Sequence, residues 1–310
     1  VVADILTGSL SDNLEDNSDL LSKTRTSNYL SYLATYTGSA SFGDIDATSS
    51  VLDIPVENIS ITPGANISVG SSSGDSSVDV SALLGKAASD HRDYRKVHVI
   101  GAAKDMTIAG DVTFSNTNDA EDHALVLGAA DDFMLNGSDI TYTGSNLGLG
   151  AGGSDSDSMY LVNTNITTGG NLAAGTLGTL NISSANFNVG NGGHDSDPDN
   201  VYLYANELIQ VNGLNFSGSR LDDVYMEAIT INLKNVAFPS TADVILKSRD
   251  GTVNFPDTFS NYKVGSVNLT NVSHGGTVLT ESHFDGVAGH HDSSIRLPNG
   301  TAAVKIRKQY

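Results

Sequence analysis

Two stretches of this sequence align with each other at an offset of 27 residues. VIGAAKDMTIAGDVTF (99–114) lies over VLGAADDFMLNGSDITY (126–142), with one residue inserted near the end of the second. YANELIQVNGLNF (204–216) is a looser third copy. Each copy contains a strand pattern, a tight turn of Gly, Asn or Asp, and another strand pattern. Imperfect repeats of roughly 25–40 residues are typical of solenoid coils, each of which buries its apolar face against its neighbours.

Apolar and polar residues alternate through most of residues 50–285, as in KVHVIG, DMTIAGDVTF and ITINLKNVAF. A period of two indicates strands, and the Gly, Asn and Asp between these runs indicate turns. A β-sandwich would show the same alternation but not the alignment between copies. We therefore expect an all-β, parallel β-solenoid. We expect ten residues of the first copies to face its core: Val97, Val99, Met106, Ile108, Val112, Phe114, Leu125, Leu127, Phe133 and Leu135.

The two ends of the chain differ from the repeats. We interpret residues 1–40 as an N-terminal cap or assembly segment, residues 41–295 as the solenoid, and residues 296–310 as a basic C-terminal strand or tail. A helix beginning at Ser11 or Asp12 would cover the open backbone edges of the first coil. The stretch NYLSYLATY within this segment also alternates well enough to form a strand. The leucines that such a helix would turn inward are Leu14, Leu20, Leu21, Leu30 and Leu33.

The chain is strongly acidic, with 36 Asp and Glu against 16 Lys and Arg and a formal charge of −20. Without a basic patch to neutralise phosphates, binding to nucleic acid or to an anionic membrane surface is disfavoured. No apolar run approaches the ~18 residues of a membrane span. The sequence contains no cysteine and does not begin with methionine, which is compatible with a mature exported protein. We expect a secreted protein at the cell surface or outside the cell.

Three runs carry a resemblance to known proteins: DNVYLYANELIQVNGLNF (199–216), VYMEAITINLKNVAFP (224–239) and GSVNLTNVSHGG (265–276). With its strand–turn–strand repeats, the chain resembles filamentous-haemagglutinin-type β-helical surface proteins. It is most similar to an uncharacterised group of secreted Gly/Asn-rich proteins from marine bacteria of the verrucomicrobial type. The resemblance covers roughly residues 95–290. It implies export and a single-stranded, right-handed parallel β-helix, but no activity and no site residues.

An acidic loop is the candidate metal site. In NVGNGGHDSDPDNVYL (188–203), Asp195, Asp197 and Asp199 alternate as in the first half of an EF-hand, where hard oxygens surround calcium. Position 12 would be Asn206, which excludes an EF-hand but leaves a looser calcium site between coils. The stretch 146–158 matches 186–198 at an offset of 40 and adds Asp155 and Asp157 as candidate ligands. The alternative is that these residues only form turns on a solvated edge.

An enzyme is a less favoured interpretation. Polygalacturonases are parallel β-helices with NTD, DD, GHG and RIK segments in that order, and this chain reads NTN (163–165), DD (222–223), SHGG (273–276) and IRL (295–297). Three of the four segments are incomplete. Only Asp222 and Asp223 could supply the paired carboxylates that glycoside hydrolysis needs. We expect no catalytic residues and no cofactor besides calcium.

The two ends carry opposite charge. Opposite charges at opposite ends of a rod favour head-to-tail stacking, which yields filaments when the contact does not close. The final stretch TAAVKIRKQY could also join a neighbouring subunit as an added strand, although basic residues on an edge strand can equally prevent such pairing. The predicted interface consists of Asp4, Asp12, Glu15, Asp16 and Asp19 at one end and Arg296, Lys305, Arg307 and Lys308 at the other.

We therefore expect an extracellular structural protein whose partners are copies of itself. The alternative is a monomeric adhesin or glycan-binding β-helix. That protein would present exposed aromatic side chains beside the acidic loops, such as Tyr160, Tyr202 and Tyr204, to an extracellular polysaccharide.

Overall fold

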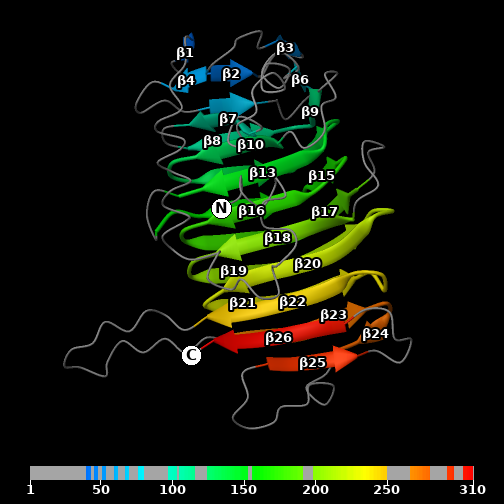
Figure 1. Ribbon diagram of the computed structural model, residues 1–310. Coiled ribbons are helices and arrows are strands. Elements are labelled where there is room, and N and C mark those ends of the chain that lie inside the picture. The colour runs from blue at the N-terminus through cyan, green and yellow to red at the C-terminus, as the bar shows by residue number, and fades with distance from the viewer. Residues whose placement is uncertain are drawn as a thin grey trace, which may run out of the picture.

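The computed structural model describes residues 105–115, 124–152, 156–190, 198–249 and 266–279, together with strands between residues 40 and 102 and between residues 292 and 309. These described residues form strands, turns and connections, and none of them is helical. The strands stack coil on coil with parallel pairing (Figure 1), which confirms the predicted all-β parallel β-solenoid. The predicted N-terminal cap, whether helix or strand, lies outside the described residues.

One of the two long sheets has nine strands, in the order β25-β26-β22-β20-β18-β16-β13-β10-β7. All its neighbours are parallel except β25 and β26, which are antiparallel. Figure 1 shows these strands from β7 near the top to β25 near the bottom. Their bounds are β7 (Val97–Ala102), β10 (Ala124–Ala129), β13 (Asn146–Ala151), β16 (Leu172–Thr176), β18 (Asp199–Ala205), β20 (Leu221–Ala228), β22 (Asp243–Arg249), β25 (Asp292–Arg296) and β26 (Ala303–Gln309).

The other long sheet has fifteen strands and changes character along the stack. In the early coils it consists of two runs of short strands, and both runs pair with β17, which merges them. A separate two-stranded sheet joins β1 (Ala40–Phe42) and β4 (Ile59–Ile61). The fifteen strands are β2 (Ile45–Ala47), β3 (Val51–Asp53), β5 (Ile67–Val69), β6 (Ser76–Asp79), β8 (Met106–Ala109), β9 (Val112–Ser115), β11 (Phe133–Asn136), β12 (Asp139–Tyr142), β14 (Met159–Val162), β15 (Asn165–Thr168), β17 (Thr179–Val189), β19 (Leu208–Ser217), β21 (Thr230–Phe238), β23 (Ser266–His274) and β24 (Thr277–Val278).

The strand register confirms the main sequence repeat. Val99 pairs with Val126, and Met106 pairs with Phe133, so both pairs keep the offset of 27 residues. Val112 pairs with Ile140, which places the inserted residue between these positions. Copies that align in sequence therefore lie in adjacent coils, because equivalent positions must point to the same face of a parallel ladder.

A column of left-handed residues marks the bend within the fifteen-stranded sheet. Successive pairings bring these residues into line, one per coil. A left-handed backbone costs an ordinary L-residue roughly 1–2 kcal/mol, whereas Gly adopts it freely and Asn tolerates it. The small and amide side chains therefore permit the chain to turn at the same place in each coil. The column consists of Gly110, Gly137, Asn163, Ser184, Gly213, Asn235 and Asn271, with φ between 48° and 89°.

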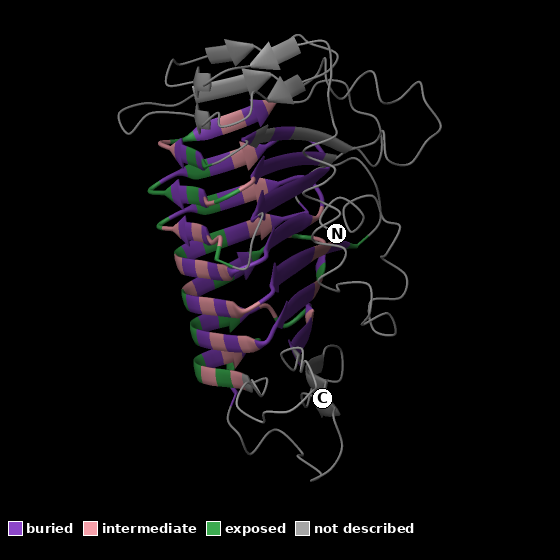
Figure 2. Ribbon diagram, turned by 90° about the vertical axis from the view of Figure 1, so that its left-hand side faces the viewer, coloured by how far each residue is buried: buried purple, intermediate pink, exposed green. Residues whose placement is uncertain are grey.

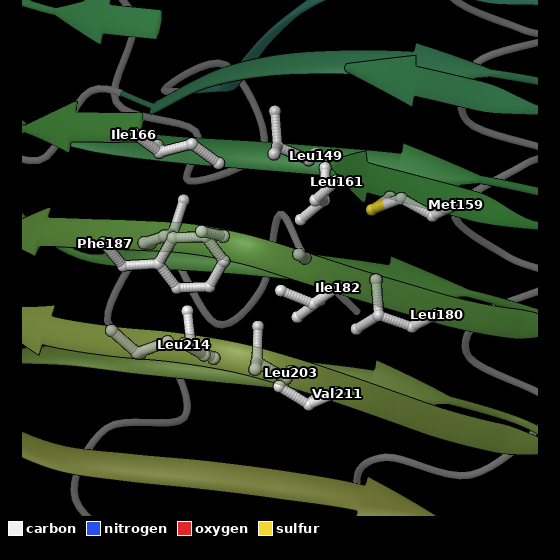
Figure 3. Packing of buried hydrophobic residues seen from close by; sticks show 14 of the residues in the cluster. Leu149, Met159, Leu161, Ile166, Leu180, Ile182, Phe187, Leu203, Val211 and Leu214 are labelled. Atoms are coloured by element: carbon white, nitrogen blue, oxygen red, sulfur yellow. The ribbon is translucent and has the colours of Figure 1, made fainter. Parts of the chain in front are cut away.

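The core lies between the two long sheets. Alternate residues of each strand point inward and pack on equivalent residues one coil away (Figure 3). Phe216 lies between two other aromatic rings, with its centroid 5.9 Å from that of Phe187 and 5.3 Å from that of Phe238. Of the predicted core residues, eight are buried in this cluster: Met106, Ile108, Val112, Phe114, Leu125, Leu127, Phe133 and Leu135.

The other two residues, Val97 and Val99, pair with Ala124 and Val126 of β10, and their side chains lie outside the described part of the chain. Ile100 of the same strand pairs with Leu127, and both residues are buried in the core. The stretch KVHVIG alternates over so few residues that both phases of the pattern contain apolar side chains.

Side-chain amides link successive coils on the outside of the solenoid. Asn186 donates to Asn165 over 2.6 Å, and Asn215 donates to Asn186 over 3.0 Å. Where strands of the nine-stranded sheet begin, Asn171 donates to Asn146 over 2.9 Å and accepts from the backbone of Asn200 over 2.8 Å. Stacked amides of this kind satisfy donors and acceptors along the axis, because the parallel register keeps them within hydrogen-bond distance.

The C-terminal strand belongs to the solenoid of its own chain. β26 pairs in parallel with β22 and in antiparallel with β25. The fifteen-stranded sheet closes in the same manner, because β24 folds back antiparallel onto β23. Residues 303–309 therefore do not extend as a free strand, in contrast to the expectation that the C-terminal stretch could join a neighbouring subunit.

Candidate functional site

Asp199, the described member of the predicted calcium loop, is held by an arginine. It begins β18, and its carboxylate lies 3.0 Å from the guanidinium of Arg220, with only 4% of the Asp199 side chain exposed. The same guanidinium donates to the carbonyl of Gly169 over 3.0 Å and to that of Gly190 over 3.4 Å. Arg220 thus connects its own coil to the two preceding coils through charge-assisted hydrogen bonds.

Asp157 lies at the opposite end of the strands of the nine-stranded sheet. It follows β13, and its backbone carbonyl accepts a hydrogen bond from the hydroxyl of Thr176 at the end of β16. Asp199 instead lies at the start of β18. The structure therefore does not bring Asp157 and Asp199 together, while Asp155, Asp195 and Asp197 lie outside the described residues.

The sequence match at an offset of 40 residues does not reflect equivalent positions. Residues 146–151 form β13 of the nine-stranded sheet, whereas residues 186–189 end β17 of the fifteen-stranded sheet. The two Asp-rich loops consequently follow different sides of a coil. Among the described residues, no three His, Cys, Asp or Glu side chains gather as a metal site would require. Calcium at Asp195 and Asp197 stays a prediction.

The aromatic side chains predicted to be exposed divide into two groups. Tyr160 points outward from the fifteen-stranded sheet and is half-buried. Tyr202 and Tyr204 point outward from β18, but each is only 3% exposed, so the prediction was wrong for both. Burial raises the pKa of Tyr202 well above the usual tyrosine value, and the negative charge of Asp223 adds to this, while a hydrogen bond with Asn200 opposes it.

A buried charged cluster lies next to these tyrosines. Glu227 of β20 and Lys247 of β22 occupy paired positions, and the ammonium lies 3.6 Å from the carboxylate. The hydroxyl of Tyr225 donates to the same carboxylate oxygen over 2.7 Å. Glu227 is fully buried and Lys247 is 2% exposed. Ion pairs this dry are unusual, because removing both charges from water costs several kcal/mol per ion before attraction compensates.

This cluster was missed in the sequence, although a signal for it was present. VYMEA (224–228) lies over VILKS (244–248) at an offset of 20, and the register pairs them residue by residue. In that alignment Glu227 pairs with Lys247. Both follow an inward-facing residue, Met226 or Leu246, so both point outward. Opposite charges at one outward position of adjacent coils are what a cross-strand ion pair looks like in sequence.

The segments that matched the polygalacturonase pattern are dispersed. Asn163 lies at the left-handed bend, and Asn165 belongs to an outward amide ladder. Asp222 and Asp223 lie near the start of β20, where Asp222 is exposed. His274 ends β23 and is buried, with its Nε2 2.8 Å from the carbonyl oxygen of Ala242. The described residues of this pattern do not converge on one site.

The predicted assembly residues fall into two sets. The acidic set, Asp4 to Asp19, lies outside the described residues. The basic set lies on the last two strands of the nine-stranded sheet, with Arg296 ending β25 and Lys305, Arg307 and Lys308 within β26. In the part of the chain that is described, no helix is long and apolar enough to cross a membrane.

Comparison with known proteins yields no relative: no family model, no curated protein and no solved structure matches this chain. Function must therefore be argued from the solenoid itself.

Proposed function

We propose that this protein is an extracellular structural β-solenoid that assembles head to tail. One observation carries the proposal: β26 and β25 come last in the order of the nine-stranded sheet, so Arg296, Lys305, Arg307 and Lys308 lie at one end of the stack, where Asp292 is the one acidic residue of these two strands. The strands at the other end, β2 and β3, contain Asp46 and Asp53. A rod with opposite charges at its ends favours heterologous stacking, which has no closed endpoint.

The amide ladders support a structural role. Outward amides such as Asn165, Asn186 and Asn215 bond to the next coil. Such bonding along the axis resists bending and separation of coils in the manner of stacked parallel strands. The location outside the cell rests on the resemblance to secreted β-helical proteins, and fractionation of the producing cells tests it.

The mode of assembly differs from strand donation. Since β26 already pairs on both edges within its own chain, a neighbour cannot capture it without breaking native pairing. Contact between ends would instead rely on charged side chains, with β25 outermost. Such a contact weakens at high ionic strength, because salt screens exposed charges within about 10 Å at 0.1 M.

Negative-stain microscopy at low and high salt tests the proposal. The test variant reverses three charges of β26, K305E, R307E and K308E, while the control variant K234E reverses an exposed charge on β21 of the fifteen-stranded sheet, which does not pair with β26. Substitution is preferable to deletion, because removing β26 would expose the edge of β22. We expect fibres from the wild type and the control at low salt and none from the triple variant. Isolated particles from all three proteins would discard assembly.

A monomeric glycan-binding module is the second candidate, favoured by one outward column of the fifteen-stranded sheet. Uncharged hydroxyl and amide groups repeat there once per coil, at the strand spacing of about 4.8 Å. They belong to Thr141, Thr167, Asn188 and Ser217, and all four are half-buried or exposed. The test is binding to a glycan array by wild type and by T141V/T167V, with T107V, on the other run of the same sheet, as control.

A further inference from the structure

Two backbone carbonyls meet one side chain at the corner where the chain leaves the fifteen-stranded sheet. The strands β15 and β17 alternate buried with less buried residues (Figure 2) and end on paired residues, Thr168 and Val189. Gly169 and Gly190, which follow them, therefore occupy equivalent places in successive coils. The carbonyl oxygen of Gly169 lies 3.0 Å from Nη2 of Arg220, and that of Gly190 lies 3.4 Å from its Nε.

A carboxylate completes this set of oxygens. Oδ2 of Asp199 lies 3.0 Å from Nη2 of Arg220, the same nitrogen that donates to Gly169. Gly190 permits the close approach, because a Cβ built on it would lie 2.7 Å from Oδ2 of Asp199 and 3.2 Å from Cβ of Arg220. Two carbonyls and one carboxylate from two coils thus surround a guanidinium from the coil that follows.

The three oxygens have the chemistry of a cation site. Carboxylates and backbone carbonyls are the ligands that calcium prefers, and a calcium ion takes about six to eight of them. The carbonyl of Gly190 also accepts from the hydroxyl of Ser219 over 3.1 Å, which fixes its direction. A planar guanidinium always carries a positive charge and donates in several directions, so Arg220 can satisfy all three oxygens without a metal.

We propose that this corner is a cation site between coils whose resident cation is Arg220, and that it takes a hard divalent cation such as calcium once the guanidinium is removed. In the wild type, Asp199 is then not a calcium ligand, although it belongs to the loop for which the sequence predicts calcium. The arginine makes the stacking of these three coils independent of metal. The prediction for Asp195 and Asp197 is separate, since neither residue belongs to this site.

Urea unfolding with and without calcium tests the proposal. R220A removes the guanidinium and leaves room beside the three oxygens, whereas R220M removes the charge but keeps most of the side-chain volume, which makes it the matched control. With only three protein oxygens, we expect binding at the weak end of the calcium range, with a Kd of about 10⁻⁴–10⁻³ M. Calcium above this concentration should raise the urea midpoint of R220A by more than that of R220M or the wild type. A calcium site elsewhere in the chain would raise all three midpoints equally.

Two further measurements identify the ligand and the kind of cation. The double variant D199N/R220A keeps both carbonyls but lacks the anionic oxygen, so calcium should stabilise it no more than it stabilises R220M. Guanidinium chloride at the same low concentration should also raise the midpoint of R220A, because it returns the missing cation to the site. Potassium chloride at equal ionic strength should have no such effect.

The experiment decides the question even where R220A does not fold by itself. In that case calcium should restore the β-sheet circular dichroism of R220A and should not restore that of D199N/R220A. A response of R220A to calcium no greater than that of R220M, whether the chain begins folded or unfolded, would overturn the proposal. An equal response of D199N/R220A would overturn it as well, because the calcium would then bind without the carboxylate of Asp199.

Discussion

Lys247 and Glu227 hold their charges 3.6 Å apart on adjacent strands, with both side chains out of contact with solvent. They lie on the outward face of the nine-stranded sheet, where a solenoid usually meets water. The attraction between them is strong in this environment, and so is the penalty for leaving either one alone.

Removing one partner of this pair should destabilise the fold much more than removing both. We expect E227Q or K247M alone to lower the free energy of unfolding by about 3–5 kcal/mol, because each leaves an uncompensated buried charge. The double variant E227Q/K247M should be markedly more stable than either single variant. Urea unfolding measures all three, with K234M, at an exposed lysine, as control. Additive losses in the double variant would show that the two charges do not compensate each other.

Replacing Arg220, which bonds to groups in three coils, should destabilise the fold by a similar amount. R220M keeps the length of the side chain but leaves the buried carboxylate of Asp199 without its cation, so we expect a loss of about 3–5 kcal/mol at neutral pH. R220K should recover only part of this, because one ammonium cannot reproduce the planar set of donors. The deficit of R220M should shrink in acid, where the carboxyl can take up a proton. Urea unfolding across pH checks this, and a deficit independent of pH would contradict it.

Substitutions of Asn163 at the left-handed bend should differ in their effect on stability. Asn163 has φ of 48°, so N163V should destabilise the protein by roughly 1–2 kcal/mol because of the steric penalty of a β-branched residue there. N163G should be tolerated, since Gly adopts this backbone freely. T167V on the following extended strand is the matched control. Thermal unfolding ranks the four proteins, and a stable N163V would refute the steric account.

Tyr202 should limit stability at high pH. Burial raises its pKa in the folded protein, whereas an unfolded tyrosine ionises near pH ~10. The neutral form is therefore favoured by folding. Its contribution is complete below about pH 10 and is lost as the pH rises from there toward the folded pKa. Y202F should retain more of its neutral-pH stability than the wild type above this pH, and Y160F should behave as the wild type. Tyrosinate absorbance and unfolding measured together test this, and early ionisation of Tyr202 without unfolding would contradict it.

The repeat that relates Met106 to Phe133 was readable in the sequence, because residues that stack coil on coil share one chemistry and one phase. The phase of KVHVIG was not readable, since this run is so short that both phases contain apolar residues. Only the pairing with β10 selects Ile100 for the core. The match between the two Asp-rich loops wrongly suggested equivalent positions in two coils, because Gly and Asp are favoured at every turn of a coil.

The sequence by itself determined the strands, the turns and the repeat, because alternation and turn chemistry are local properties of the chain. The tertiary structure alone decided which outward face is buried, and therefore that Tyr202 and Tyr204 are not exposed aromatics. It also decided that Arg220 meets Asp199 and that Lys247 meets Glu227. Such contacts depend on the register between coils and on what packs against a sheet, and neither is encoded in any single strand.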